Sequence, residues 1–257
     1  MVTKKTMSIK LAVSGKGGVG KTTIAGTLAR LFARDGSKVI AIDADPAMNL
    51  ASALGTKNPT PLSKLREIIS ERVGSGPVYK MNPKVDDIIE KYSARAPDGV
   101  QLIVMGTIER GGEGCVCPEA AFLRAVLGSV VFGEDVMVMD MEAGIEHLGR
   151  GVTRNIDLML VVVEPGMRSI DTAARIKQLC GDIGIRNVAS VINKVSNGKK
   201  EIEKSLKELA LPVLGRIPYD EALIKADLEG KAPLDAGGRA VREIEKVKNE
   251  ILGMLRK

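Results

Sequence analysis

Aromatic residues are scarce in this chain of 257 residues, which has no tryptophan, three phenylalanines and three tyrosines. Single-stranded nucleic acids are held largely by stacking of bases on aromatic side chains, so the composition offers few platforms for that kind of recognition. Hydrophobic residues nevertheless make up 44% of the chain, which is long enough to bury a sizeable core. That core must be built from aliphatic side chains and methionine.

Long apolar runs are absent as well. No stretch approaches the roughly 18 to 20 residues that a helix needs to cross a bilayer, and the basic start leads into a strand-like run without a cleavable apolar segment. Lysine and arginine (38) outnumber aspartate and glutamate (32), but the two signs are mixed, which favours an ordinary solvated surface. We expect a cytoplasmic protein that binds neither nucleic acid nor, stably, a membrane.

Cysteine is rare, with three residues. Cys115 and Cys117 are separated by one residue, and a disulfide between them would close only a small strained ring. Cys180 lies in a predicted helix and is interpreted as a small buried hydrophobic residue. The pair therefore raises the question of reactivity or metal binding.

Short β-branched runs alternate with helical stretches along the chain. The runs span residues 9–13, 39–42, 101–105, 136–139, 158–163 and 188–192. Because they are continuously apolar, they predict a doubly wound α/β fold, with a mostly parallel sheet covered by helices on both faces. We expect a single domain over residues 1–257, with an irregular helical insertion around 55–99. A one-sided apolar stripe in residues 237–257 predicts a final helix packed on the sheet.

A glycine-rich run follows the first predicted strand and consists of Gly15, Lys16, Gly17, Gly18, Val19, Gly20, Lys21, Thr22 and Thr23. The order of strand, turn and helix is that of a phosphate-binding P-loop. The glycines let backbone N–H groups surround the phosphates of ATP or ADP, and Lys21 places a charge on the β- and γ-phosphates. Thr22 offers a hydroxyl to Mg²⁺. The run predicts Mg²⁺-dependent ATP hydrolysis.

The second lysine, Lys16, is the unusual feature of this loop. It resembles the deviant Walker A family, which includes the nitrogenase iron protein, the MinD and ParA ATPases and several metal-insertion ATPases. In that family the early lysine reaches across a dimer interface to the partner's nucleotide. The resemblance implies an ATP-dependent homodimer in which Lys16 and Lys21 are both catalytic.

Carboxylates end two further predicted strands, where ligands bind in open α/β sheets. We interpret Asp45 as the residue that orients the attacking water, Asp43 as support for the Mg²⁺ shell, and Asp140 as a Walker B equivalent that holds the metal through water. An Asp-x-Asp-Pro segment can also simply turn the chain into the next helix.

Two later positions resemble the family's base-contacting residues. Asn193 ends the sixth run and corresponds to an adenine-reading asparagine, and Pro218 belongs to a second loop beside the base. Residue chemistry alone favours a turn former, because an asparagine at a strand end commonly has that role.

The cysteine pair precedes a predicted helix over residues 118–127, and a helix N-terminus favours the thiolate, the form that binds metal. Two thiolates are half of a tetrahedral shell, whereas Cys115 and Cys117 from both subunits of a symmetric dimer would complete it. Ligand type alone does not choose between Zn²⁺ and Ni²⁺. The alternative is a pair of partly buried thiols at a helix cap.

With Cys115 and Cys117 and the segment 140–147, the chain resembles the accessory ATPases of the CooC type, which deliver nickel to carbon monoxide dehydrogenase. This implies a metallochaperone whose client is a nickel enzyme, with acetyl-CoA synthase as an alternative client. A positioning ATPase like MinD or ParA is a second reading. The nitrogenase iron protein has a cluster cysteine where this chain has His147, so the ligand set for an iron–sulfur cluster is missing. His147 is either an accessory metal ligand or a structural residue.

Overall fold

A computed structural model describes residues 8–74, 80–107, 118–133, 135–142, 155–196 and 200–256. These ranges form an eight-stranded sheet in the order β3-β4-β2-β5-β1-β6-β7-β8. Its strands are β1 (Lys10–Gly15), β2 (Val39–Ala44), β3 (Ala94–Arg95), β4 (Gln101–Val104), β5 (Val136–Met141), β6 (Leu158–Val163), β7 (Val188–Val195) and β8 (Val213–Pro218). All neighbouring strands are parallel except β3 and β4. The predicted doubly wound α/β fold is confirmed.

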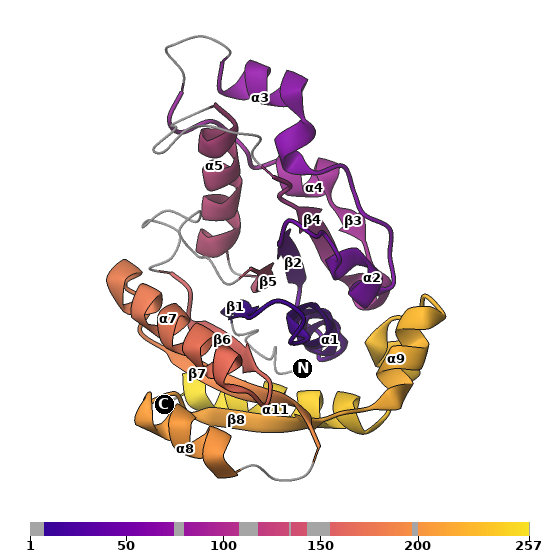
Figure 1. The fold of residues 1–257 in the computed structure, drawn as a ribbon. Helices are drawn as coiled ribbons and strands as arrows, with labels where there is room; N and C mark the ends of the chain where they lie inside the picture. Colours follow the sequence, from indigo (N-terminus) through magenta and orange to yellow (C-terminus); the bar gives the residue numbers. More distant parts are fainter. Residues whose placement is uncertain are drawn as a thin grey trace, which may run out of the picture.

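Helices cover both faces of the sheet (Figure 1). The helices are α1 (Lys21–Arg34), α2 (Leu50–Leu54), α3 (Arg66–Arg72), α4 (Ile88–Tyr92), α5 (Pro118–Phe132), α7 (Met167–Ile183), α8 (Lys200–Glu208), α9 (Glu221–Leu228), α10 (Pro233–Ala236) and α11 (Arg239–Leu255), with short 3-10 turns η1 (Leu62–Lys64) and η2 (Pro97–Gly99). Buried side chains of α1, α2, α10 and α11 join one core layer, and those of α3, α4, α5, α7 and α8 join the other.

The strands divide their side chains between these two layers. In β5, Val136 and Val138 pack with α1 and α11, whereas Met137 and Met139 pack with α5 and α7. Every residue of β1, β5 and β6 is buried. Because successive strand residues point to opposite faces, a sheet covered on both sides needs the continuous apolar runs seen in the sequence.

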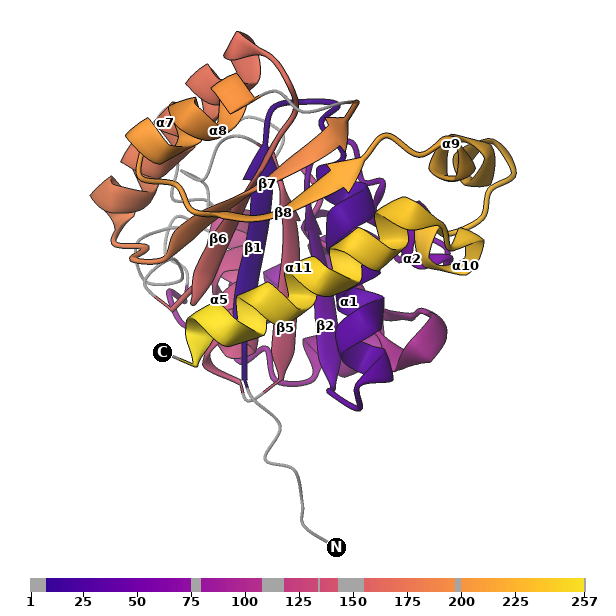
Figure 2. The same ribbon diagram turned by 90° about the horizontal axis from the view of Figure 1, so that it is seen from below.

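The last helix, α11, crosses the sheet beside α1, as Figure 2 shows. The predicted stripe is confirmed, because Val241, Ile244, Val247 and Ile251 are buried against the strands. The helix also approaches β8 closely: a Cβ at Gly215 would collide with Val247.

Two strands of the sheet were not predicted. β8 is an edge strand whose apolar run is interrupted by Gly215 and Arg216, so it lacks the pattern of a central strand. β3 has two residues and lies in the stretch 55–99, which also contains η1, α3, α4 and η2. This stretch contacts α5 through α3 and η1, and its buried side chains belong to the same core layer as those of α5.

Candidate active site

The P-loop runs from the end of β1 into α1, at the centre of the sheet, where the order of connections reverses. Ligands bind at such switch points, beside the carboxyl ends of the strands. Gly20 precedes α1 with φ of 95°, and a Cβ there would collide with the side-chain amide of Asn193, so the turn requires glycine. The first turn of α1 contains no acidic residue. The backbone N–H groups of this turn can therefore donate hydrogen bonds to a phosphate.

The two lysines of the loop occupy different environments. The side chain of Lys21 is 7% exposed, and its Nζ lies 3.6 Å from Oδ2 of Asp45. The side chain of Lys16 is 39% exposed, and its Nζ lies 3.4 Å from Oε1 of Glu164. Lys21 is thus enclosed within the subunit, whereas a second molecule could reach Lys16 from outside.

Asp140 and Thr22 meet below the phosphate loop. The Thr22 hydroxyl donates to Oδ2 of Asp140 at 2.6 Å, and Asp140 is fully buried. Its other carboxylate oxygen, Oδ1, is buried without a hydrogen-bond partner among the described residues. Burial raises the pKa of Asp140 to about 7, although the Thr22 bond acts in the opposite direction. An orphaned carboxylate oxygen beside a threonine hydroxyl fits a hard cation such as Mg²⁺.

Asp43 organises the loop that follows β2. Its Oδ1 accepts from the backbone N–H of Asp45 at 3.2 Å, and its Oδ2 accepts from that of Leu50 at 2.9 Å. Burial raises the pKa of Asp43 to about 6. Asp43 thus holds the turn into α2, and Asp45 faces Lys21. Support of the Mg²⁺ shell by Asp43 stays a prediction.

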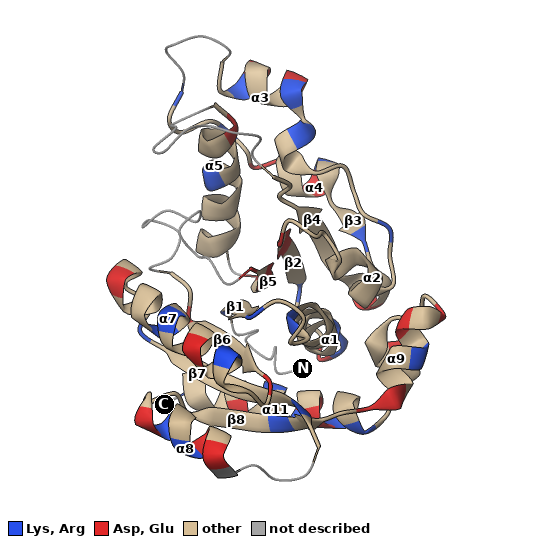
Figure 3. Cartoon of the chain, viewed as in Figure 1, with Lys and Arg blue, Asp and Glu red and all other residues tan. Residues whose placement is uncertain are grey.

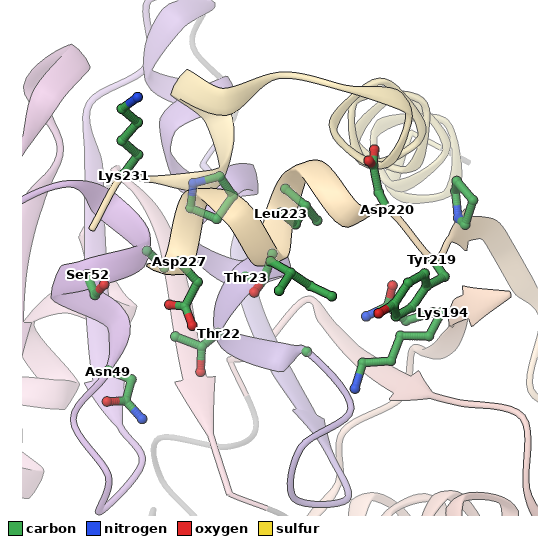
Figure 4. A pocket seen from close by; sticks show the side chains of 16 residues that line it. Thr22, Thr23, Asn49, Ser52, Lys194, Tyr219, Asp220, Leu223, Asp227 and Lys231 are labelled. Atoms are coloured by element: carbon green, nitrogen blue, oxygen red, sulfur yellow. The ribbon is translucent and has the colours of Figure 1, made fainter. Parts of the chain in front are cut away.

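A cavity of about 480 Å³ opens beside the P-loop (Figure 4). It is lined by Gly20, Thr22, Thr23, Asn49, Ser52, Ala53, Asn193, Lys194, Pro218, Tyr219, Asp220, Leu223, Ile224, Asp227, Lys231 and Pro233. The structure thus brings Asn193 and Pro218, predicted from distant segments, to one cavity. Asn193 also donates from Nδ2 to the carbonyl of Val19 at 2.7 Å, which ties β7 to the loop.

Some residues of this region were missed by the sequence reading. Lys194 adopts a left-handed conformation with φ of 55°, and its Nζ donates to the carbonyl of Gly18 at 2.6 Å. Glu164 follows β6 and lies between Lys16 and Lys194. The strand-end rule that identified the aspartates would also have found Glu164, because it directly follows a buried strand.

Cys115, Cys117 and His147 lie outside the described residues. Within the described ranges, no group of three or more histidine, cysteine, aspartate or glutamate side chains is arranged to hold a metal ion. Cys180 is fully buried in α7, as predicted, and burial raises the pKa of its thiol to about 12. None of the helices in the described ranges is long and apolar enough to cross a membrane.

Comparisons with known proteins agree with this geometry. Residues 10–234 match the family model of the CobQ/CobB/MinD/ParA nucleotide binding domain. An uncharacterised ATP-binding protein of Methanocaldococcus jannaschii is 49% identical, over 95% of this chain and 98% of its own. The carbon monoxide dehydrogenase accessory protein CooC of Rhodospirillum rubrum is 41% identical, over 88% of this chain and 90% of its own. A ParA family ATPase from Chlorobium tepidum superposes with a TM-score of 0.72 at 20% identity, covering 95% of this chain and 98% of that one.

Proposed function

The chain belongs to the CobQ/CobB/MinD/ParA nucleotide-binding domain family of P-loop ATPases, and on that premise we propose that it is an ATP-hydrolysing metallochaperone for nickel. In this proposal ATP closes a homodimer, and Cys115 and Cys117 of both subunits bind Ni²⁺ for delivery to carbon monoxide dehydrogenase. The observation that carries the proposal is the pairing of an enclosed Lys21 with a partly exposed Lys16 in one P-loop. The 41% identity to an accessory protein of that enzyme supports the choice of client.

The phosphate loop first binds and positions the phosphates of ATP for hydrolysis. The N-terminus of α1 and Lys21 bind the β- and γ-phosphates of ATP, and little covalent chemistry is left for the protein beyond positioning. Asp45 orients the attacking water: its Oδ1 accepts from the N–H of Ala47 at 3.0 Å, which fixes the carboxylate, while Oδ2 stays beside Lys21. Asn193 and Pro218 contact the base from the wall of the cavity.

Thr22 and Asp140 would hold Mg²⁺ near the phosphates, with Asp140 acting through water. When bound, the ion would neutralise charge on the phosphate oxygens. Burial raises the pKa of Asp140, and a bound cation would lower it by favouring the charged carboxylate.

Lys16 completes the site from the partner subunit. An ammonium placed against the transferring phosphoryl group stabilises the charge that develops in the transition state, as in other phosphoryl-transfer enzymes that receive a cation in trans. Because Lys16 is supplied only by dimerisation, hydrolysis is coupled to the closed dimer. Closing and reopening the dimer would assemble and release a metal site made of both cysteine pairs.

Metal binding tests the proposal most simply. The double variant Cys115→Ser/Cys117→Ser should lose stoichiometric Ni²⁺ binding, measured by equilibrium dialysis with metal analysis, while phosphate release from ATP persists. Cys180→Ser serves as the matched control, because that thiol is fully buried in the core and its replacement should leave nickel binding unchanged. Full nickel binding by the double variant would rule out the metallochaperone.

The client is tested by reconstitution. Nickel-free carbon monoxide dehydrogenase is incubated with the loaded chain and ATP, and recovered activity is measured against the same mixture containing the double cysteine variant. If the loaded chain activates nickel-free acetyl-CoA synthase but not carbon monoxide dehydrogenase, acetyl-CoA synthase is the client.

A positioning function of the MinD or ParA kind would need a surface for membrane or DNA. The apolar face of α11 is buried against the sheet, so it is not free to enter a lipid surface. Basic and acidic side chains alternate on α8, α9 and α11 (Figure 3). Co-sedimentation with liposomes or DNA in the presence of ATP should therefore give no retention.

A further inference from the structure

Glu164 connects the two lysines that flank the phosphate loop. It follows β6 directly, and its backbone N–H donates to the hydroxyl of the buried Ser169 at 3.0 Å, which fixes the turn into α7. Its Oε1 lies 3.4 Å from Nζ of Lys16, and its Oε2 lies 3.6 Å from Nζ of Lys194. One carboxylate is therefore shared between a lysine inside the loop and a lysine that holds the loop from β7.

Without the Glu164 carboxylate, Lys194 would keep a second hydrogen-bond partner, whereas Lys16 would lose its ion pair. Lys194 also donates to the carbonyl of Gly18 at 2.6 Å, so it stays anchored to its own subunit. Lys16 contacts Glu164 with an ammonium that is otherwise partly exposed. If Lys16 acts on a nucleotide in another subunit, its Nζ has to leave Glu164 first.

We propose that Glu164 is a positioning residue that holds Lys16 against its own P-loop, and that ATP-dependent dimerisation breaks this ion pair in each subunit. The inference rests on the proposed function, since it requires Lys16 to act across a dimer interface. Glu164 then opposes dimerisation until the phosphates of the partner's ATP replace it as the counter-ion of Lys16. A chain without ATP stays monomeric because no such replacement is offered.

The size of the effect follows from the exposure of the pair. An ion pair that is partly open to solvent shifts an equilibrium by a factor of up to about 5. Two such pairs break in each dimer, so neutralising Glu164 should tighten the ATP-bound dimer by about 5- to 20-fold.

The experiment measures the dimer dissociation constant of the full chain by sedimentation equilibrium, with Mg²⁺ and a non-hydrolysable ATP analogue at saturation. Glu164→Gln should tighten the dimer. Glu243→Gln is the matched control, because it removes a carboxylate paired with Lys246 at 2.8 Å on α11, and should leave the constant unchanged. In a Lys16→Ala background, which should itself be monomeric, Glu164→Gln should not restore a dimer, since there is no ammonium left to release.

A shorter acid separates charge from packing. Glu164→Asp keeps the charge and should remain within about 3-fold of the unmodified chain, as expected of a partly exposed ion pair. A dimer as tight as that of Glu164→Gln would assign the effect to side-chain packing and overturn the inference. An unchanged or weaker dimer in Glu164→Gln would also overturn it, while the proposed function would stand. If the unmodified chain stays monomeric with the analogue, the proposed function itself fails.

Discussion

The proposed role of Asp45, which orients the attacking water, can be tested by replacing that residue alone. Its Oδ2 lies beside Lys21, and its side chain is 17% exposed, so a water molecule can reach the carboxylate. Asp45→Asn keeps the shape and the contact with Ala47 but removes the charge that orients the water. We expect the turnover number to fall by at least about 100-fold, with affinity for the ATP analogue within about 3-fold.

Phosphate release and analogue binding, measured on the same preparation, check this expectation. Asp182→Asn, an exposed aspartate at the end of α7, provides the matched control and should hydrolyse ATP normally. If Asp45→Asn hydrolyses ATP at the normal rate, another group orients the attacking water.

Asp140 gives the protein a pH dependence of its own. Its pKa is raised by burial to about 7 in the folded chain, from 3.8 for the ordinary side chain. Between these values the folded state binds more protons than the unfolded state, so its contribution to the free energy of unfolding falls as the pH rises from about 4 to 7. Asp140→Asn removes the contribution, and its stability relative to the unmodified chain should rise by on the order of 2 kcal/mol between pH 5 and 7.

Urea unfolding from pH 5 to 8, without nucleotide or Mg²⁺, measures this difference. Asp43, whose pKa is raised to about 6, titrates in both chains and so contributes to both curves. Asp98 and Asp235 have lowered pKa values and act at more acidic pH. A difference between the two chains that is constant from pH 5 to 8 would show that Asp140 is already ionised in the folded protein.

At the scale of elements, α1 and α2 approach each other through Gly26. A Cβ at Gly26 would lie 2.8 Å from Cβ of Ala53, and α2 carries part of the cavity wall. Gly26→Ala should therefore push the two helices apart and lower the free energy of unfolding by about 1–3 kcal/mol. Affinity for nucleotide should fall with it, because Ser52 and Ala53 line the cavity.

Gly253→Ala is the control for this substitution. Gly253 lies within α11 and a Cβ there has no neighbour within 4 Å, so alanine should leave stability unchanged or raise it by up to about 1 kcal/mol. Chemical denaturation of both variants measures the contrast. Equal free energies of unfolding for the two variants would mean that α1 and α2 can move apart without destabilising the fold.

The central elements were predictable because their signals are local. The strands β1, β2, β4, β5, β6 and β7 are apolar runs buried on both faces, and the glycines of the P-loop mark its turn. β8 was missed because its identity depends on α11 and on its place at the edge of the sheet. Glu164 could have been found by its place after a buried strand, but its partners could not, because Lys16 follows β1 and Lys194 lies in β7, and only the folded sheet brings the three charges together.

The contacts of Asp43 and Asp45 could not be predicted from the sequence. The sequence assigned the attacking water to Asp45 and support of the Mg²⁺ shell to Asp43, but not which groups of the chain each carboxylate contacts. The backbone N–H groups of Asp45 and Leu50 occupy the oxygens of Asp43, which leaves Asp45 beside Lys21. Such hydrogen bonds depend on the path of the loop, which residue types do not specify.

At the scale of the whole molecule, one chain is half of the proposed dimer. The described ranges supply a complete phosphate loop, a carboxylate and hydroxyl that fit Mg²⁺, and the cavity proposed for the base. The partly exposed Lys16 and the cysteine pair have their proposed partners in a second copy of the chain. The central claim is therefore that ATP joins two subunits and that the joined subunits bind nickel.

Sedimentation velocity combined with metal analysis of the sedimenting species tests that claim most directly. With Ni²⁺, Mg²⁺ and a non-hydrolysable ATP analogue, the account predicts one species of about twice the 27.3 kDa mass of the chain, carrying one nickel ion. Lys16→Ala should sediment as the monomer under the same conditions. A nickel-loaded monomer, or a Lys16→Ala chain that forms the same nickel-bound dimer, would contradict the account.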